Sequence, residues 1–203
     1  MIVKIKTALL TFLALTMTSP AYASMAKIGE HAPAFTTMDI HGKAFNLEDQ
    51  KGKIVVLEWT NHDCPFVMKH YGTGNMQASQ KAATEQGVVW VSIVSSALGN
   101  QGNVTPEQAQ KIVLNVQANA TTRILDPSGE IGHLYGAKTT PHMYVIDKDG
   151  KLAYMGAMDD HPSPNPKAVE GAQNYVLKAI DELIKGEAVS MASTKPYGCS
   201  VKY

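Results

Sequence analysis

The chain has 203 residues, of which 44% are hydrophobic and 18% are charged, and this composition excludes collagen, coiled coils and disordered polyelectrolytes. Its 18 basic residues balance 18 acidic ones, and a protein without a basic excess is not expected to bind nucleic acid. Two cysteines are too few for a disulfide-rich scaffold. The length suits one hydrophobic core, so we expect a single globular domain.

Residues 1–23 have the three parts of a secretory signal peptide. Two lysines make a basic start, a short apolar run covers residues 8–17, and Ala21-Tyr22-Ala23 supplies an A-x-A cleavage site. The run is shorter than the roughly 20 apolar residues that a membrane span requires. An uncleaved anchor or a buried first helix is the alternative. We therefore expect a protein exported to the periplasm or another extracytoplasmic compartment, with a mature domain at 24–203 and no stable membrane insertion after cleavage.

The first half of the mature chain reads as strand, helix, strand, helix. Residues 54–59 are nearly all apolar and β-branched, which predicts a strand buried on both faces. A short polar loop follows, and Cys64-Pro65 then begins a helix, because proline is favoured at the first helical position. A second buried strand is expected at 88–94. Thr105-Pro106-Glu107-Gln108 is a capping box that begins a helix reaching about residue 118.

The second half predicts a hairpin followed by a helix. A short strand at 124–125 and a turn precede two strands at 142–146 and 152–155, which the hairpin signal Asp147-Lys148-Asp149-Gly150 connects. Apolar residues at helical spacing from 169 to 184 predict a last helix, and a tail occupies 186–203. This order of elements predicts one layered α/β domain.

Cys64 is the candidate nucleophile, because it begins a helix directly after a buried strand. Free amide groups and the helix dipole at that point favour the thiolate, and Lys69 on the same helix is expected to add positive charge. In such settings a cysteine pKa falls from about 8.5 to roughly 3.5–7.5. The thiolate is the form that attacks disulfides and peroxides. A buried structural cysteine is the alternative.

Several motifs together resemble the redoxins, the thioredoxin-fold family that includes peroxiredoxins and membrane-associated thiol-disulfide reductases. The resemblance covers residue 29 to about residue 183 and implies a thioredoxin-like fold, in which helices flank a central mixed β-sheet. It matches Pro141, after Thr140, to the cis-proline whose loop faces the active cysteine. The motifs are Gly29-x-x-Ala32-Pro33-x-Phe35, Asp39-x-x-Gly42-Lys43-x-Phe45-x-Leu47, Gly52-Lys53-x-Val55-Val56-Leu57, Asp126-Pro127-x-Gly129, Tyr135-Gly136 and Thr140-Pro141-x-x-Tyr144-Val145-Ile146-Asp147-x-x-Gly150.

The active-site segment departs from both well-known redoxin types. Cys64-Pro65-Phe66-Val67 lacks the second cysteine of C-x-x-C, and Leu57 and Asn61 replace the proline and threonine of the peroxiredoxin motif P-x-x-x-T-x-x-C. Peroxiredoxins also carry an arginine near the strand after the proline loop, where this chain has none; Arg123 lies elsewhere. The chain most resembles the peroxiredoxin-like redoxins (alkyl hydroperoxide reductase and thiol-specific antioxidant type) that keep Cys-Pro-x-x-x-Lys and a C-terminal Gly-Cys, here Gly198-Cys199.

The same resemblance implies roles for two further side chains and an exposed Cys64. Glu58 matches the buried acid beneath the thioredoxin cysteine, where desolvation raises a carboxyl pKa and allows proton transfer. A solvated acid, or one paired with a lysine, is the alternative. Cys199 is the only resolving thiol available within the chain. A cycling Cys64–Cys199 pair, a static disulfide and no bond between them all remain open.

We therefore expect an exported thiol-disulfide oxidoreductase that acts on protein or small-molecule thiols and disulfides. A thiol-dependent peroxidase, with peroxide as substrate, is the first alternative, and a redox-inert module that binds a partner or a metal is the second. No cofactor is expected, and no metal, because His62, Asp63 and His70 around Cys64 match no standard zinc spacing. Asp159-Asp160-His161 is expected to be a solvated loop. The candidate site residues are Cys64, Cys199, Glu58 and Lys69 for catalysis and Pro65, Thr140 and Pro141 for the substrate groove.

Overall fold

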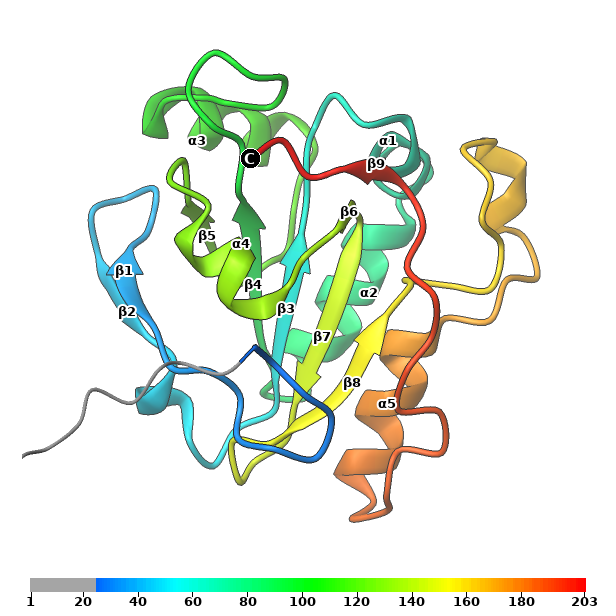
Figure 1. Ribbon diagram of the computed structural model, residues 1–203. Helices are drawn as coiled ribbons and strands as arrows, with labels where there is room; N and C mark the ends of the chain where they lie inside the picture. The colour runs from blue at the N-terminus through cyan, green and yellow to red at the C-terminus, as the bar shows by residue number, and fades with distance from the viewer. Residues whose placement is uncertain (1–24) are drawn as a thin grey trace, which may run out of the picture.

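The computed structural model describes residues 25–203, so the predicted signal peptide lies outside the described residues. A five-stranded mixed sheet crosses the centre of the domain in the order β5-β4-β3-β7-β8 (Figure 1). Its parallel strands are β3 (Val55–Trp59), β4 (Val89–Val94) and β5 (Thr122–Leu125), and its antiparallel strands are β7 (His142–Ile146) and β8 (Leu152–Gly156). The predicted thioredoxin-like α/β fold is confirmed.

Helices and small strands complete the domain. The α-helices are α1 (Pro65–Gly72), α2 (Asn75–Thr84), α3 (Pro106–Asn115), α4 (Glu130–Tyr135) and α5 (Tyr175–Ile184), and the 3-10 helices are η1 (Glu48–Gln50) and η2 (Pro166–Val169). Two small antiparallel sheets pair β1 (Thr36–Met38) with β2 (Ala44–Asn46) and β6 (Thr139–Thr140) with β9 (Cys199–Ser200). No helix of residues 25–203 is long and apolar enough to cross a membrane.

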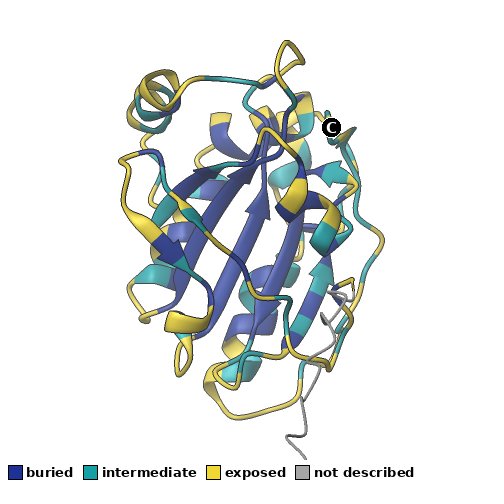
Figure 2. Ribbon diagram, turned by 60° about the vertical axis from the view of Figure 1, so that its left-hand side comes forward, coloured by how far each residue is buried: buried dark blue, intermediate teal, exposed yellow. Residues whose placement is uncertain are grey.

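The central strands are buried along their whole length, as Figure 2 shows. Side chains of a strand alternate between the two faces of the sheet, so each central strand supplies two cores. Leu57 and Trp59 face one core, and Val56 faces the other. This explains why the strands read as continuous apolar runs instead of alternating ones.

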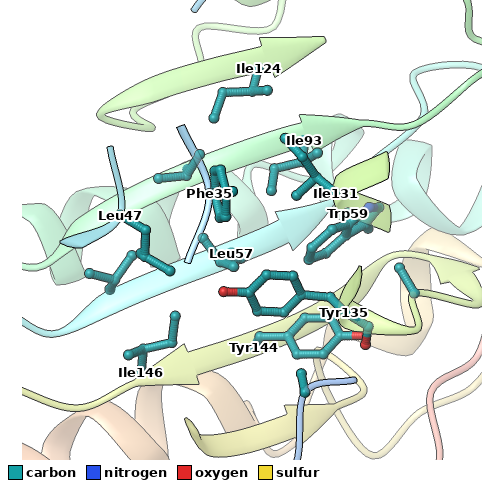
Figure 3. Close-up of a cluster of buried hydrophobic side chains, with 14 of the residues drawn as sticks. Phe35, Leu47, Leu57, Trp59, Ile93, Ile124, Ile131, Tyr135, Tyr144 and Ile146 are labelled. Atoms are coloured by element: carbon teal, nitrogen blue, oxygen red, sulfur yellow. The ribbon is translucent and has the colours of Figure 1, made fainter. Parts of the chain in front are cut away.

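The first core lies between the sheet, α4 and the chain before β3 (Figure 3). Four aromatic rings form its centre: Tyr135 lies 5.4 Å from Trp59, 5.5 Å from Tyr144 and 6.0 Å from Phe35, measured between ring centroids. The edge-to-face and tilted arrangements are those that aromatic rings prefer. The core fixes the end of β3, from which the chain continues to Cys64.

The second core packs α1, α2 and α5 against the opposite face of the sheet. The last helix begins later than the sequence pattern predicts. Residues 166–169 form η2, Gly171 has a positive φ of 72°, and α5 begins only after Asn174, whose side chain caps Leu177 N at 2.9 Å. Helices α2 and α4 were not anticipated.

The C-terminal segment that follows α5 is ordered against the domain. Strand β9 pairs with β6, Val201 N donates to Lys138 O at 3.1 Å, and Ser193 bridges to Met155 of β8. The ring of Tyr203 stacks on His133 at 4.0 Å. Figure 1 shows this segment, in red, running from α5 past β8 to the loop that holds β6.

Replacing Leu57 by alanine tests the first core. Leu57 is fully buried, and the loss of its side chain should lower the free energy of unfolding by about 2–5 kcal/mol. Leu114→Ala is the control, because Leu114 is 75% exposed and its loss should change that free energy by less than about 0.5 kcal/mol. Urea unfolding followed by circular dichroism measures both. Equal losses in the two variants would contradict this account of the core.

Candidate active site

Cys64 occupies the N-cap position of α1, with the extended backbone angles φ −82° and ψ 123°, and Pro65 is the first helical residue. Its amide donates to Asn61 O at 3.0 Å, and its carbonyl accepts from Met68 N at 2.8 Å. The side chain itself caps no amide of the helix. The sulfur is therefore held at the helix start and is free to interact across the domain.

The Cys64 sulfur meets the loop before β7 and the C-terminal tail. It lies 3.0 Å from the carbonyl oxygen of Thr140 and 2.8 Å from the sulfur of Cys199, and both cysteines are free thiols. The Thr140-Pro141 peptide bond is cis, and Thr140 pairs directly with Cys199 in the β6–β9 register. The structure thus brings together Cys64, Cys199, Thr140 and Pro141.

The tail closes over this site, so the expectation of an exposed Cys64 is wrong. Cys64 is 0% exposed, and Thr140 and Pro141 are buried as well, while Pro65 stays exposed. The sequence pattern placed Cys64 correctly at a helix start but gave no sign that β9 lies across it. The predicted groove along Thr140 and Pro141 is occupied by the tail itself.

The two thiols have opposite tendencies to ionise. Burial raises the pKa of Cys64, but the hydrogen bond with the Cys199 side chain and further polar contacts outweigh it, so its pKa lies below the ordinary value. Burial, together with the hydrogen bond and the charge of Cys64, raises the pKa of Cys199 to about 11. Within the pair, Cys64 therefore loses its proton more readily than Cys199 does.

Glu58 is fully buried in β3 and is neither solvated nor paired with a lysine. Its oxygens accept from Tyr71 Oη at 2.9 Å, Gln80 Nε2 at 3.1 Å, Trp90 Nε1 at 2.8 Å and Ser92 Oγ at 3.4 Å. Four uncharged donors therefore replace the water that this carboxylate loses on burial. No hydrogen bond of residues 25–203 joins Glu58 to either sulfur.

Lys69 is directed at the tail and not at Cys64. Its ammonium donates to Asp159 Oδ2 at 3.3 Å, to His161 O at 2.9 Å and to Tyr197 Oη at 3.1 Å, and it lies 5.1 Å from the centre of the Tyr197 ring. Asp159 is only 3% exposed, so it does not belong to a solvated loop as expected. No hydrogen bond of residues 25–203 joins Lys69 to either sulfur.

His70 completes a continuous chain of hydrogen bonds around the Tyr197 hydroxyl. His70 Nδ1 accepts from Asn75 Nδ2 at 2.8 Å, so its proton belongs on Nε2, which donates to Tyr197 Oη at 3.3 Å. The Tyr197 hydroxyl in turn donates to Asp159 Oδ1. Burial, followed by the charge of Lys69, lowers the pKa of His70 to about 4, so this ring is neutral at neutral pH. We call Lys69, His70, Asp159 and Tyr197 the tail latch.

Gly198 connects the tail latch to Cys199. Its φ is 137°, a region that favours glycine, and a Cβ atom at this position would collide with the carbonyl oxygen of Thr140. The ring of Phe66 on α1 packs 5.8 Å from that of Tyr197. The latch therefore fixes the tail one residue before the point at which the tail approaches Thr140 most closely.

Sequence reasoning did not find Tyr197, Asp159 or His70 as parts of this site. Tyr197 carried one usable signal, its position next to Gly198-Cys199, whereas Asp159 was assigned to a loop. No group of three or more His, Cys, Asp or Glu side chains in residues 25–203 is arranged to hold a metal ion. His62 pairs with Asp63 at 3.5 Å, away from the tail latch.

A cysteine that begins a helix beside a cis-proline loop, on a mixed sheet of this order, defines a thioredoxin-fold thiol protein. The sequence model of the AhpC/TSA family matches residues 28–155, which is more than half of the chain. The chain therefore belongs to the AhpC/TSA family, and the expected redoxin relationship is confirmed.

Individual proteins of known name or structure are more distant. The chain is 29% identical over 126 residues to the thiol-disulfide oxidoreductase ResA of Bacillus thuringiensis subsp. konkukian, covering 62% of this chain and 67% of that one. An uncharacterized conserved protein from Geobacillus kaustophilus superimposes with a TM-score of 0.76 at 28% identity, covering 88% and 93% of the two chains. A hypothetical protein from Sinorhizobium meliloti 1021 has the same TM-score at 23% identity, covering 89% and 96%, and shows the fold alone.

Cys199→Ala should raise the pKa of Cys64. The substitution removes a polar partner that favours the Cys64 thiolate, so the pH at which Cys64 is half-alkylated by iodoacetamide should move upward. Mass spectrometry of the Cys64 peptide gives the rate at each pH. In the matched variant Cys199→Ser, a hydroxyl donor remains, and the shift should be smaller. An unchanged midpoint in the alanine variant would show that Cys199 does not stabilise the thiolate.

Tyr197→Phe should loosen the tail without unfolding the domain. Loss of a buried hydroxyl from a hydrogen-bond network costs about 1–3 kcal/mol, so alkylation of Cys64 through tail opening should accelerate roughly ten-fold. The control is Tyr175→Phe, because the Tyr175 hydroxyl makes no hydrogen bond within residues 25–203. Equal alkylation rates in the two variants would contradict the latch.

Proposed function

We propose that this protein is an exported thiol-disulfide oxidoreductase of the redoxin type, in which Cys64 and Cys199 cycle between two thiols and one disulfide. The observation that carries the proposal is the Cys64–Cys199 contact of 2.8 Å between sulfurs whose pKa values are shifted in opposite directions. One thiol is thereby prepared to attack, and the other retains a proton until it is needed. The ResA relative supports this class of reaction.

The exchange proceeds in two balanced steps. The Cys64 thiolate attacks one sulfur of a substrate disulfide, forming a mixed disulfide and releasing the other sulfur as a thiolate, which takes up a proton. Cys199 then gives up its proton and attacks the Cys64 sulfur, so that the Cys64–Cys199 disulfide forms and the second substrate thiol is released. The substrate gains the two electrons that the cysteine pair loses. An external dithiol returns the pair to its reduced form by the same steps in reverse.

Access to Cys64 requires the tail to move. Because β9 covers the sulfur, the first attack needs the β6–β9 pairing to open, and the exposed Pro65 with Thr140 and Pro141 then forms the wall beside the substrate. Lys69 acts in this scheme by holding the tail through Tyr197. Glu58 acts on protonation only through space or through bridging water, since no direct hydrogen bond joins it to the thiols.

The substrates are protein or small-molecule thiols and disulfides in an oxidising compartment. The signal-peptide pattern of residues 1–23 supports export, most simply to the periplasm. A cysteine pair can form a disulfide in that compartment, whereas thiols in the cytosol are kept reduced.

A thiol-dependent peroxidase is the second candidate, and membership of the AhpC/TSA family favours it. In that reaction the Cys64 thiolate would take one oxygen from a peroxide, giving a sulfenic acid and an alcohol or water, and Cys199 would then form the disulfide with loss of water. Asn61 stands where peroxiredoxins carry threonine, and its side-chain amide donates to Gln101 O at 3.2 Å. This contact holds the Asn61 side chain against the loop that contains Gln101.

Substitution of each cysteine separates the candidates. With reduced wild-type protein, insulin disulfides should be reduced faster than hydrogen peroxide is consumed; Cys64→Ser should abolish insulin reduction. Cys199→Ala should still attack and should accumulate a mixed disulfide with oxidised glutathione at Cys64, seen by mass spectrometry. Fast peroxide consumption with sulfenic acid on Cys64 would favour the peroxidase. Full insulin reduction by Cys64→Ser would eliminate both candidates.

A further inference from the structure

A cavity of about 580 Å³ opens on the other side of α1, between α1, α3 and the end of β3. Four buried side-chain polar atoms of residues 25–203 have no hydrogen-bond partner, and three of them belong to residues that line this cavity: Arg123 (Nε), Thr60 (Oγ1) and Gln77 (Oε1). The fourth belongs to Thr140 at the cysteine site. Buried polar groups in proteins are nearly always paired, so three unpaired atoms on the residues around one cavity point to a missing ligand.

Arg123, the only arginine of the chain, is the central group of this cavity. It is 5% exposed, on β5, and within residues 25–203 its guanidinium makes no ion pair and no hydrogen bond. The guanidinium of an arginine is always charged, and its burial without a partner is costly. The guanidinium presents a planar set of donors that matches a carboxylate.

Glu58 forms no direct ion pair with Arg123 among residues 25–203. The two residues lie on the same face of the sheet, separated by Ser92 of the strand between them. The oxygens of Glu58 are occupied by the four neutral donors described above. The charges interact through space, but the donors of the guanidinium remain available to a ligand.

Gln77 and the cavity walls define the rest of the ligand. The Gln77 amide nitrogen donates to Tyr71 O at 2.8 Å and to Val116 O at 2.7 Å, which fixes its orientation and leaves Oε1 to accept from a donor in the cavity. Thr60, 1% exposed, supplies a hydroxyl. The walls combine apolar side chains, Met68 and Ile112 among them, with the polar side chains of His62, Asn115 and Gln117.

We propose that this cavity binds a small organic carboxylate that also carries an N–H donor and an apolar group, as an N-acylated apolar amino acid does. The carboxylate pairs with Arg123 and Thr60, the N–H donates to Gln77 Oε1, and the apolar group packs against Met68 and Ile112. The volume lies within the range of small-molecule sites, roughly 300–1,000 Å³. The site is separate from the thiol exchange proposed above, and either can fail without the other.

Calorimetry of the reduced protein with two matched probes tests the site. N-Acetylleucine should bind at a single site, and N-acetylleucinamide, which differs only in lacking the negative charge, should bind at least about ten-fold more weakly. Neither probe contains sulfur, so the result does not depend on Cys64 chemistry. Equal affinities for the two probes, absence of binding, or equally tight binding of inorganic phosphate would each overturn the proposal.

Three variants locate the binding. Arg123→Met should weaken N-acetylleucine binding at least about ten-fold while leaving the melting temperature unchanged or higher, because an unpaired buried charge is removed. Ile112→Trp keeps Arg123 but fills the cavity, and it should abolish binding even if Arg123→Met does not fold. The control Lys111→Met removes an exposed charge from α3, the helix that also carries Ile112. It should change the affinity less than about two-fold. Binding that survives both cavity substitutions, or a lower melting temperature of Arg123→Met with unchanged binding, would show that Arg123 is a structural counter-charge.

Discussion

The contact between two sulfurs that lie 135 positions apart in the sequence is the constraint on which the site depends. One sulfur is placed by the start of a helix and the other by a two-residue strand pair, and the contact between them requires the tail to be closed. The short β6–β9 pairing is too small to be stable alone. Gly198, which approaches Thr140 where no Cβ would fit, and the tail latch around Tyr197 supply the rest.

Three buried charged side chains of this domain, Glu58, Lys69 and Arg123, lie in different surroundings. Glu58 is surrounded by neutral donors, and Lys69 is paired with Asp159 and with the tail. Arg123 has neither arrangement among the described residues. The first two solutions satisfy the rule that a buried charge must be solvated by the protein. The exception is therefore informative, because a protein retains such a charge where function requires it and not where stability alone is selected.

Local signals carried the parts of the fold that the sequence predicted well. The continuous apolar runs of β3 and β4, the capping box of α3 and the Cys64-Pro65 helix start depend on neighbouring residues, and all three are observed. Helix α3 nevertheless ends at Asn115, because Gln117 adopts a positive φ of 52° that its residue type does not announce. Helix α2 has a weakly apolar face and so gave no clear period.

The parts of the site that escaped prediction are those made by contacts between distant segments. The closure over Cys64 depends on a tail that looks like a loop, since Gly198 and the polar residues around it are equally typical of a free terminus. The tail latch depends on side chains from α1, from the segment after β8 and from the tail, and no spacing along the chain relates them. The sequence predicts a solvated Asp159 because two polar residues follow it. In the structure, Lys69 and Tyr197, which are distant in sequence, bind Asp159 and bury it.

In the exchange proposed above, closure of the tail affects the two steps differently. With Cys199 already against Cys64, formation of the internal disulfide needs no search, since the second thiol acts at the high effective concentration of an oriented intramolecular group. The first step has no such advantage, because the substrate must replace the tail at the Thr139–Thr140 edge before it can reach the sulfur. A mixed disulfide therefore persists only while the latch stays open, and the strength of the latch sets both how seldom Cys64 is attacked and how quickly the attack is resolved.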